Sequence, residues 1–234
     1  MTGNQGNSKK NRKLNPVKRL SILKAAEKIF SRKGFHEATV SDIAKKANVS
    51  EATIYEYFTS KEELLFSIPA EIVREYQEKN VEILQYVKGA ANKLRTLIYR
   101  HLSLYADNED YANVVMLILK GNRNFLKTDE YNVIQRSARN TIQVLQEGID
   151  NGEFRPDLQP YLVRAMIWGT IEHLVTRKSL LGKPEDLFSM ADEMINTLFH
   201  GILADSRNGA IHLRVTVENK IGPAPVPTEH SEKG

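Results

Sequence analysis

Apolar residues recur every three or four positions from residue 16 to residue 202 of this chain, which is the period of an amphipathic α-helix. Beyond residue 60 this period predicts helices over 61–86, with a bend near Pro69, over 92–106, 131–150 and 160–181, and from Pro184 onward. Residues 111–119 are nearly all apolar, so we expect them to be buried on most sides. No segment before residue 205 alternates as a strand would. The pattern predicts an all-α fold.

The stretch TVSDIAKKANVSEATIYEYFTSK, from Thr39 to Lys61, predicts two short helices joined by a tight turn and followed by a third. Thr39 occupies an N-cap position, and Asp42 three residues later provides the partner carboxylate of a capping box. Asn48 tolerates the left-handed conformation that ends a helix. Ser50 then caps the second short helix. This spacing is that of a helix-turn-helix unit.

The second short helix places Ile54 and Phe58 inward, four residues apart, and turns small or polar residues outward. Such a face can meet base edges in a major groove. We expect base contacts from Ala52, Thr53 and Tyr55, phosphate contacts from Thr39 and Lys61, and contacts at the rim from Ser50, Glu51 and Tyr57. Glu51 needs a cytosine amino group to offset its repulsion from phosphates. On spacing alone, a helical hairpin packed in a core remains the alternative.

The charge distribution points to the same surface. The net charge of +4 divides unevenly, because residues up to Lys61 contain 13 Lys and Arg against 5 Asp and Glu. The chain has no cysteine, no apolar run long enough to span a bilayer and no apolar signal core at its start. We therefore expect a cytoplasmic protein that does not enter a membrane and has double-stranded DNA as a partner.

Residues that would support catalysis or metal binding form no recognisable pattern. The six histidines have no metal-ligand spacing, and no phosphate-binding loop, nucleophile elbow or dinucleotide fingerprint occurs. We expect no catalytic site, no cofactor and no metal. Glu172 and His173, beside Arg177 in an apolar helix, form either a polar pair at an interface or pocket wall or an internal hydrogen bond.

The predicted organisation has four parts: a disordered basic arm over 1–14, a three-helix DNA-binding domain over 15–61, a helical ligand-binding and dimerisation domain over 62–204, and a mostly disordered tail over 205–234. The arm either follows the phosphate backbone or is a solvated tail. The last two long helices, with the small residues Ala165 and Gly169, are candidates for a dimer seam, although they can instead pack only on their own domain. Two recognition helices related by symmetry read a palindrome.

The run GFHEATVSDIAKKANVSEATIYEYFTSKEEL resembles the N-terminal domain of the TetR family of bacterial regulators, except that Asn48 stands where the family commonly has glycine. The resemblance implies a homodimer whose helical C-terminal domain binds a small molecule and thereby moves the two recognition helices apart. The stretches LILKGNRNF and QEGIDNGEFRPDLQPYLVRAMIWGTIEHLVTR also resemble the subgroup that responds to fatty acyl-CoA and controls lipid metabolism. Lys120 or Arg123 would then meet the effector phosphates, or both are solvated surface; other effector-binding residues stay unassigned.

These observations predict a homodimeric transcriptional repressor that leaves its palindromic operator when a small apolar or amphipathic effector binds. One alternative is an effector-independent DNA-binding organiser whose second half only dimerises. A second is a helical enzyme or ligand carrier with an incidental basic N-terminus.

Overall fold

The computed structural model describes residues 14–204, and within that range the chain is helical with no strand. The N-terminal helices are α1 (Pro16–Glu37), α2 (Val40–Ala47), α3 (Glu51–Tyr57) and α4 (Lys61–Leu84). They are followed by α5 (Ala90–Ala106), α6 (Glu109–Asn113), the π-helix η1 (Val114–Leu119), the short 3₁₀ helix η2 (Phe125–Lys127), α7 (Asp129–Asp150), α8 (Pro160–Leu181), the short 3₁₀ helix η3 (Leu187–Met190) and α9 (Ala191–Ile202). The all-α prediction is confirmed, whereas the predicted basic arm and tail lie outside the described residues, apart from Leu14.

Helix α1 is capped at its start and interrupted near its end. The Asn15 side chain accepts hydrogen bonds from the backbone N–H groups of Val17 and Lys18, so the helix that Pro16 opens is capped. Near its other end, Gly34 has a φ of 71°, which interrupts the helical backbone before α2. α1 packs against α2 and along the first half of α4.

Helix α4 extends from the helix-turn-helix unit into the second half of the chain, and Pro69 lies buried within it. Two contacts attach its first part to α1. The Lys61 ammonium donates to the backbone carbonyls of Phe35 and Ala38 at 2.7 and 2.9 Å. Further along α4, the carboxylate of Glu71 forms a 2.7 Å ion pair with the guanidinium of Arg19 in α1.

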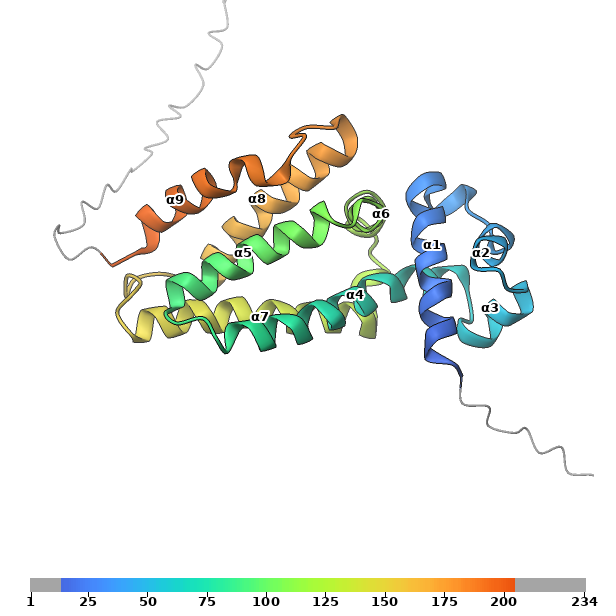
Figure 1. The fold of residues 1–234 in the computed structure, drawn as a ribbon, viewed down its shortest axis with the longest axis horizontal. Helices are drawn as coiled ribbons and strands as arrows, with labels where there is room; N and C mark the ends of the chain where they lie inside the picture. Colours follow the sequence, from blue (N-terminus) through green and yellow to red (C-terminus); the bar gives the residue numbers. More distant parts are fainter. Residues whose placement is uncertain (1–13, 205–234) are drawn as a thin grey trace, which may run out of the picture. The chain divides into compact units, whose positions relative to one another are not determined.

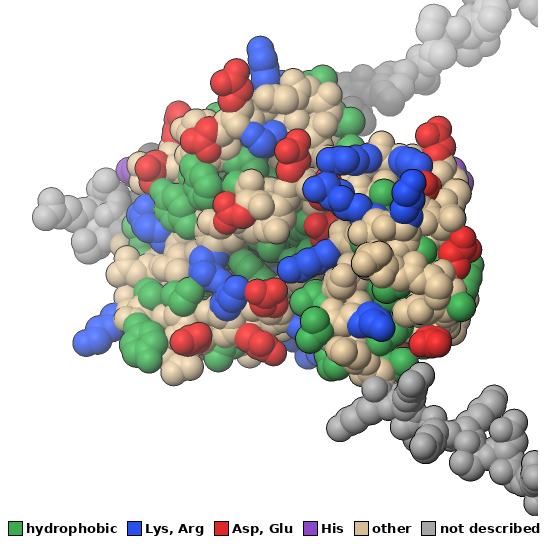
Figure 2. All heavy atoms as spheres, turned by 45° about the vertical axis from the view of Figure 1, so that its right-hand side comes forward, with side chains coloured by type: hydrophobic (Ala, Val, Ile, Leu, Met, Phe, Trp, Pro, Cys, Tyr) green, Lys and Arg blue, Asp and Glu red, His purple; other side chains and the backbone are tan. Residues whose placement is uncertain are grey.

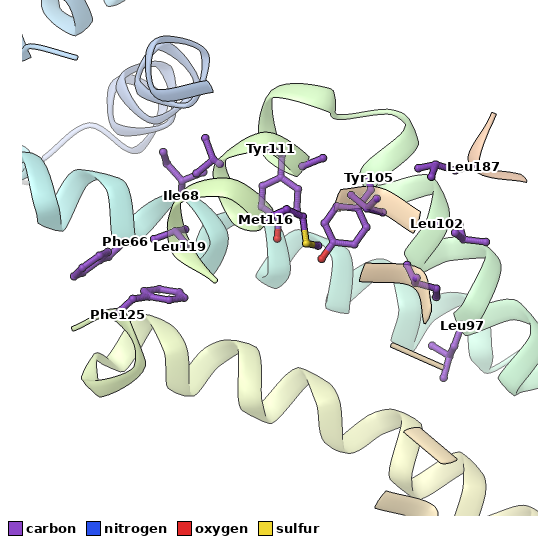
Figure 3. Close-up of a cluster of buried hydrophobic side chains, with 14 of the residues drawn as sticks. Phe66, Ile68, Leu97, Leu102, Tyr105, Tyr111, Met116, Leu119, Phe125 and Leu187 are labelled. Carbon is purple, nitrogen blue, oxygen red and sulfur yellow. The ribbon is translucent and has the colours of Figure 1, made fainter. Parts of the chain in front are cut away.

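The second half packs helices around one apolar core. Figure 1 shows α4, α5 and α7 side by side, with α8 and α9 beyond α5. Figure 3 shows the stacked rings of Tyr105 and Tyr111 beside Met116, and Phe66 beside Phe125, within this core. Among residues 14–204, no helix is both long and apolar enough to cross a membrane.

Two predicted segments differ from the structure in detail. Residues 111–119 are divided between the end of α6 and a π-helical turn, which leaves Leu117 45% exposed. Pro184 does not begin the last helix. It lies in a loop, and helical structure resumes after Asp186, whose carboxylate accepts from the Phe188 N–H and starts η3. The cap, rather than the proline, determines where the helical turn begins.

Candidate functional site

The entry to α2 is held by reciprocal hydrogen bonds. The Thr39 hydroxyl accepts from the Asp42 N–H at 3.0 Å, and the Asp42 carboxylate accepts from the Thr39 N–H at 3.1 Å, which is the predicted capping box. Asp42 also pairs with Lys33 at 2.9 Å. The hydrogen bonds from Lys33 and then from Thr39 lower the pKa of Asp42 to about 2. The cap is therefore charged throughout the physiological pH range.

The turn between α2 and α3 has the backbone that the sequence predicts. Asn48 adopts the left-handed conformation with φ 55° and ψ 48°. The following N–H, that of Val49, donates to the carbonyl of Ala44 at 3.0 Å. Ser50 then caps α3 by accepting from the Thr53 N–H at 3.1 Å. These local bonds fix the angle at which α3 leaves α2.

Helix α3 buries one face and presents the other to solvent. Ile54 and Phe58 are each 1% exposed, whereas Tyr55 is 53% exposed. No other residue between 14 and 204 forms a hydrogen bond with the Tyr55 hydroxyl, so this group is available to a partner. The exposed residues of this surface are Thr39, Ser50, Glu51, Ala52, Tyr55 and Glu56.

Five of the eight predicted contact residues, Thr39 among them, form side-chain hydrogen bonds within the protein. The Tyr57 hydroxyl accepts a hydrogen bond from the backbone N–H of Asn15 at 3.1 Å, which attaches the N-cap residue of α1 to the end of α3. Thr53 shares a 2.9 Å hydroxyl hydrogen bond with Ser50. Lys61 donates two of its three N–H groups to backbone carbonyls, and its ammonium also lies 4.5 Å from the centroid of the Phe35 ring. The eight DNA-contact assignments stay predictions.

Basic side chains gather over the first three helices. Figure 2 shows Lys and Arg side chains grouped on this part of the molecule. The exposed cations of α1 and α2 are Lys18, Lys24, Arg32, Lys33, Lys45 and Lys46. A surface of this sign attracts the phosphate backbone and makes binding dependent on salt.

A cavity of about 270 Å³ lies among α4, α5, α7, α8 and η1. Its walls combine aliphatic and aromatic side chains with several polar groups. Leu126 and Lys120, both exposed, line it as well, so the cavity opens to solvent beside them. Because α4 forms part of its wall, the cavity contacts the same helix that is attached to the helix-turn-helix unit.

His101 of α5 faces this cavity amid aromatic rings. It stacks on Trp168 of α8 with ring centroids 4.5 Å apart and meets Tyr105 edge-on at 5.1 Å. Removal from bulk water, followed by the positive charge of Arg164, lowers the pKa of His101 to about 4. The imidazole is therefore neutral at physiological pH, with one nitrogen as donor and the other as acceptor.

Of the polar residues beyond residue 110 that the sequence analysis names, some line the cavity and others do not. Lys120 pairs with Glu172 at 2.7 Å, and both line the cavity, so Glu172 is on the pocket wall. Arg123 and His173 are exposed and do not line it. Sequence reasoning missed His101, Arg164 and Trp168. The available signal for Arg164 and Trp168 was their spacing with Glu172, four residues apart on one face of the helix; His101, in α5, had none.

Helix α8 presents an apolar face to solvent. Leu162 and Met166 are 58% and 57% exposed, and the small residues Ala165 and Gly169 lie between and beside them. In α9, by contrast, the larger apolar residues Ile195, Phe199 and Ile202 are buried within the protomer. Met194 and Leu198 of α9 are half-buried, so both helices keep apolar side chains at the surface, and the dimer seam of the last two long helices stays a prediction.

Comparison with known proteins identifies the family. Residues 22–68 match the family described as bacterial regulatory proteins, tetR family, and residues 70–201 match the C-terminal region of YsiA-like proteins. The fatty acid metabolism regulator protein of Bacillus subtilis is 33% identical over 186 residues, which are 79% of this chain and 95% of that protein. The chain belongs to the TetR family.

Solved structures of TetR-type regulators share the fold. FadR from Bacillus subtilis, in complex with stearoyl-CoA, has a TM-score of 0.73 at 31% identity and covers 78% of this chain and 98% of that chain. FadR from Bacillus halodurans has a TM-score of 0.72 at 29% identity and covers 77% and 97%. As a member of the TetR family, the chain is a DNA-binding transcriptional regulator that acts as a dimer. In residues 14–204, no cluster of three or more His, Asp or Glu side chains is arranged to hold a metal ion.

Proposed function

We propose that this TetR-family protein is a cytoplasmic repressor, without enzymatic activity, that an acyl-CoA releases from a palindromic operator. The observation that carries the proposal is the double role of α4, which lines the cavity and is fastened to the DNA-reading unit. The names of the relatives add the ligand class, because one regulates fatty acid metabolism and the solved FadR structure contains stearoyl-CoA.

On DNA, each protomer inserts the N-terminal end of α3 into a major groove. Ala52, Thr53 and Tyr55 read base edges, and the Tyr55 phenol offers both a flat ring for a thymine methyl group and a hydroxyl. Thr39 and the remaining N–H of Lys61 contact phosphates. Ser50, Glu51 and Tyr57 border this contact.

The effector signal passes through α4. Tyr76 and Asn80 line the cavity, and Glu71, less than two turns earlier, is paired with Arg19 of α1. A ligand that fits best when α4 is displaced therefore shifts the population toward a dimer whose two α3 helices no longer match successive grooves. A preference of about 3 kcal/mol lowers DNA affinity by roughly a hundredfold.

A dimer formed through the exposed apolar face of α8 explains why the operator is a palindrome. Leu162 and Met166 supply apolar area, and Ala165 and Gly169 let a second copy of the helix approach closely. A two-fold axis through this face relates two recognition helices, as a palindrome requires.

The testing experiment is a DNA-binding titration against the promoter region beside the protein's own gene, with and without long-chain and medium-chain acyl-CoA. Wild type is compared with Tyr55→Ala and with Tyr86→Ala, a matched control because Tyr86 is 82% exposed and lies in the turn that follows α4. We expect selective binding in wild type and Tyr86→Ala, loss of at least about tenfold in Tyr55→Ala, and release by acyl-CoA. Weak binding without sequence preference in all three proteins contradicts the regulator; selective binding that no acyl-CoA changes contradicts the effector and favours the organiser.

A further inference from the structure

The cavity is small for a long alkyl chain. A cavity of about 150 Å³ holds one benzene ring, so about 270 Å³ encloses about ten non-hydrogen atoms. The acyl chain of stearoyl-CoA contains far more. The cavity therefore has room for only part of a chain of that length.

The walls are also more polar than a plain alkyl chain requires. Tyr105 and Tyr111 stack with ring centroids 5.7 Å apart, and Figure 3 shows both hydroxyl groups on the same side of the rings. Neither hydroxyl, nor His101, forms a hydrogen bond with another residue in the range 14–204. All three side chains line the cavity. Groups enclosed in this way normally have hydrogen-bond partners, and a saturated chain offers none.

Arg164 gives the strongest indication of a ligand. Its Nε is buried, and no other atom of residues 14–204 accepts a hydrogen bond from it. The ion pairs within this range also do not include Arg164. A guanidinium donates only, so the partner that it lacks is an oxygen acceptor.

Three residues of α8 mark positions along the cavity, starting from the place where it opens to solvent. Glu172, Trp168 and Arg164 all line the cavity and follow one another at intervals of four residues, so they lie on one face of the helix. Glu172 is paired with Lys120 where the cavity opens. Arg164 lies eight residues earlier, about 12 Å along the helix axis. Arg164 therefore lies at the end of the cavity away from this opening, the inner end, where its guanidinium also lies 5.6 Å from the ring centroid of the exposed Tyr161.

We propose that the inner end of this cavity recognises an oxygen-bearing acyl terminus, such as a hydroxyl group, through Arg164 Nε, on an acyl group of about ten non-hydrogen atoms. His101 and the hydroxyls of Tyr105 and Tyr111 supply further hydrogen bonds, and Trp168 covers the chain. This inference rests on the proposed acyl-CoA response and specifies which acyl groups produce it.

Trp168 provides a reporter inside the site, because it is the only tryptophan of the chain. Binding of ω-hydroxydecanoyl-CoA, decanoyl-CoA and stearoyl-CoA to the full-length protein is followed by Trp168 fluorescence and by calorimetry, without DNA. In wild type we expect ω-hydroxydecanoyl-CoA to bind about 10- to 100-fold more tightly than decanoyl-CoA, since a hydrogen bond to a charged donor is gained. Equal affinity of the two ligands, or tighter binding of stearoyl-CoA, overturns the inference.

The variants test the role of Arg164. Arg164→Met should abolish most of the preference for the hydroxylated ligand while decanoyl-CoA binds as before or better. Arg164→Gln, which retains a neutral hydrogen-bond donor, should keep part of the preference for the hydroxylated ligand. Arg177→Met, at an exposed arginine of the same helix outside the cavity wall, should keep all of it. An equal loss for both ligands in Arg164→Met contradicts the assignment. The wild-type comparison needs no variant to fold.

The outcomes separate the two proposals. If none of the three thioesters changes the fluorescence or releases heat, the acyl-CoA response itself is wrong. If stearoyl-CoA binds and releases DNA but the hydroxyl group brings no advantage, the response stands and only the inference about the inner end fails.

Discussion

His101 should make the stability of the protein depend on pH in a defined window. The ring stacks on Trp168 at 4.5 Å and meets Tyr105 and Tyr76 edge-on at 5.1 and 6.1 Å. Removal from bulk water and the nearby charge of Arg164 lower its pKa from 6.5 to about 4. The folded protein therefore holds His101 neutral under conditions in which the unfolded chain protonates it.

The sign follows from proton binding. Between pH 6.5 and about 4 the unfolded chain binds more protons at His101 than the folded protein, so the free energy of unfolding decreases as the pH falls. Each pH unit in this window contributes about 1.4 kcal/mol, which gives about 2 kcal/mol at pH about 5 and about 3 kcal/mol over the whole window.

The perturbation is His101→Phe, which keeps an aromatic ring for the stacking contact and cannot be protonated. Urea denaturation of both proteins at pH about 7.5 and about 5 should show that wild type loses about 2 kcal/mol more than the variant. Glu27, whose pKa burial and the nearby Asp110 raise to about 7, has the opposite pH dependence but is present in both proteins. Equal losses in wild type and variant would refute the reasoning.

Three further substitutions test features of the fold by urea denaturation. Thr39→Ala removes the α2 cap and should cost about 0.5 to 2 kcal/mol; unchanged stability would mean that Asp42 holds the start of α2 without the Thr39 hydroxyl. Gly148→Ala places a Cβ 2.1 Å from the Phe154 ring, so we expect a loss of about 1 to 3 kcal/mol; unchanged stability would mean that the ring moves freely. Lys61→Met leaves two carbonyls without their donor and should cost about 1 to 3 kcal/mol; a loss confined to DNA affinity would contradict the bridging role.

The helix-turn-helix unit could be predicted from sequence because its hydrogen bonds are local. Thr39 and Asp42 are three residues apart, and Ser50 and Thr53 repeat that spacing, so the residue types alone specify the caps. Asn48 specifies its own left-handed backbone. Each of these predictions needs only the chain within one helical turn.

The cavity could not be predicted in the same way. His101 and Trp168 meet although 67 residues separate them, and the angle between α5 and α8 decides whether they do. The sequence predicts a phosphate contact for Lys61 from its position at the start of α4, but it does not predict that the same ammonium donates to two carbonyls near the end of α1. Contacts of this kind depend on packing between helices, which periodicity does not encode.

The cavity wall also has an evolutionary consequence. Its residues all belong to α4 or to segments that follow it, and none of them belongs to α1, α2 or α3. Because the volume of a cavity changes with each methylene group gained or lost in its wall, single substitutions there can alter the preferred ligand. The surface that reads DNA is untouched by such changes. A lineage can thus acquire a new inducer while it keeps its operator.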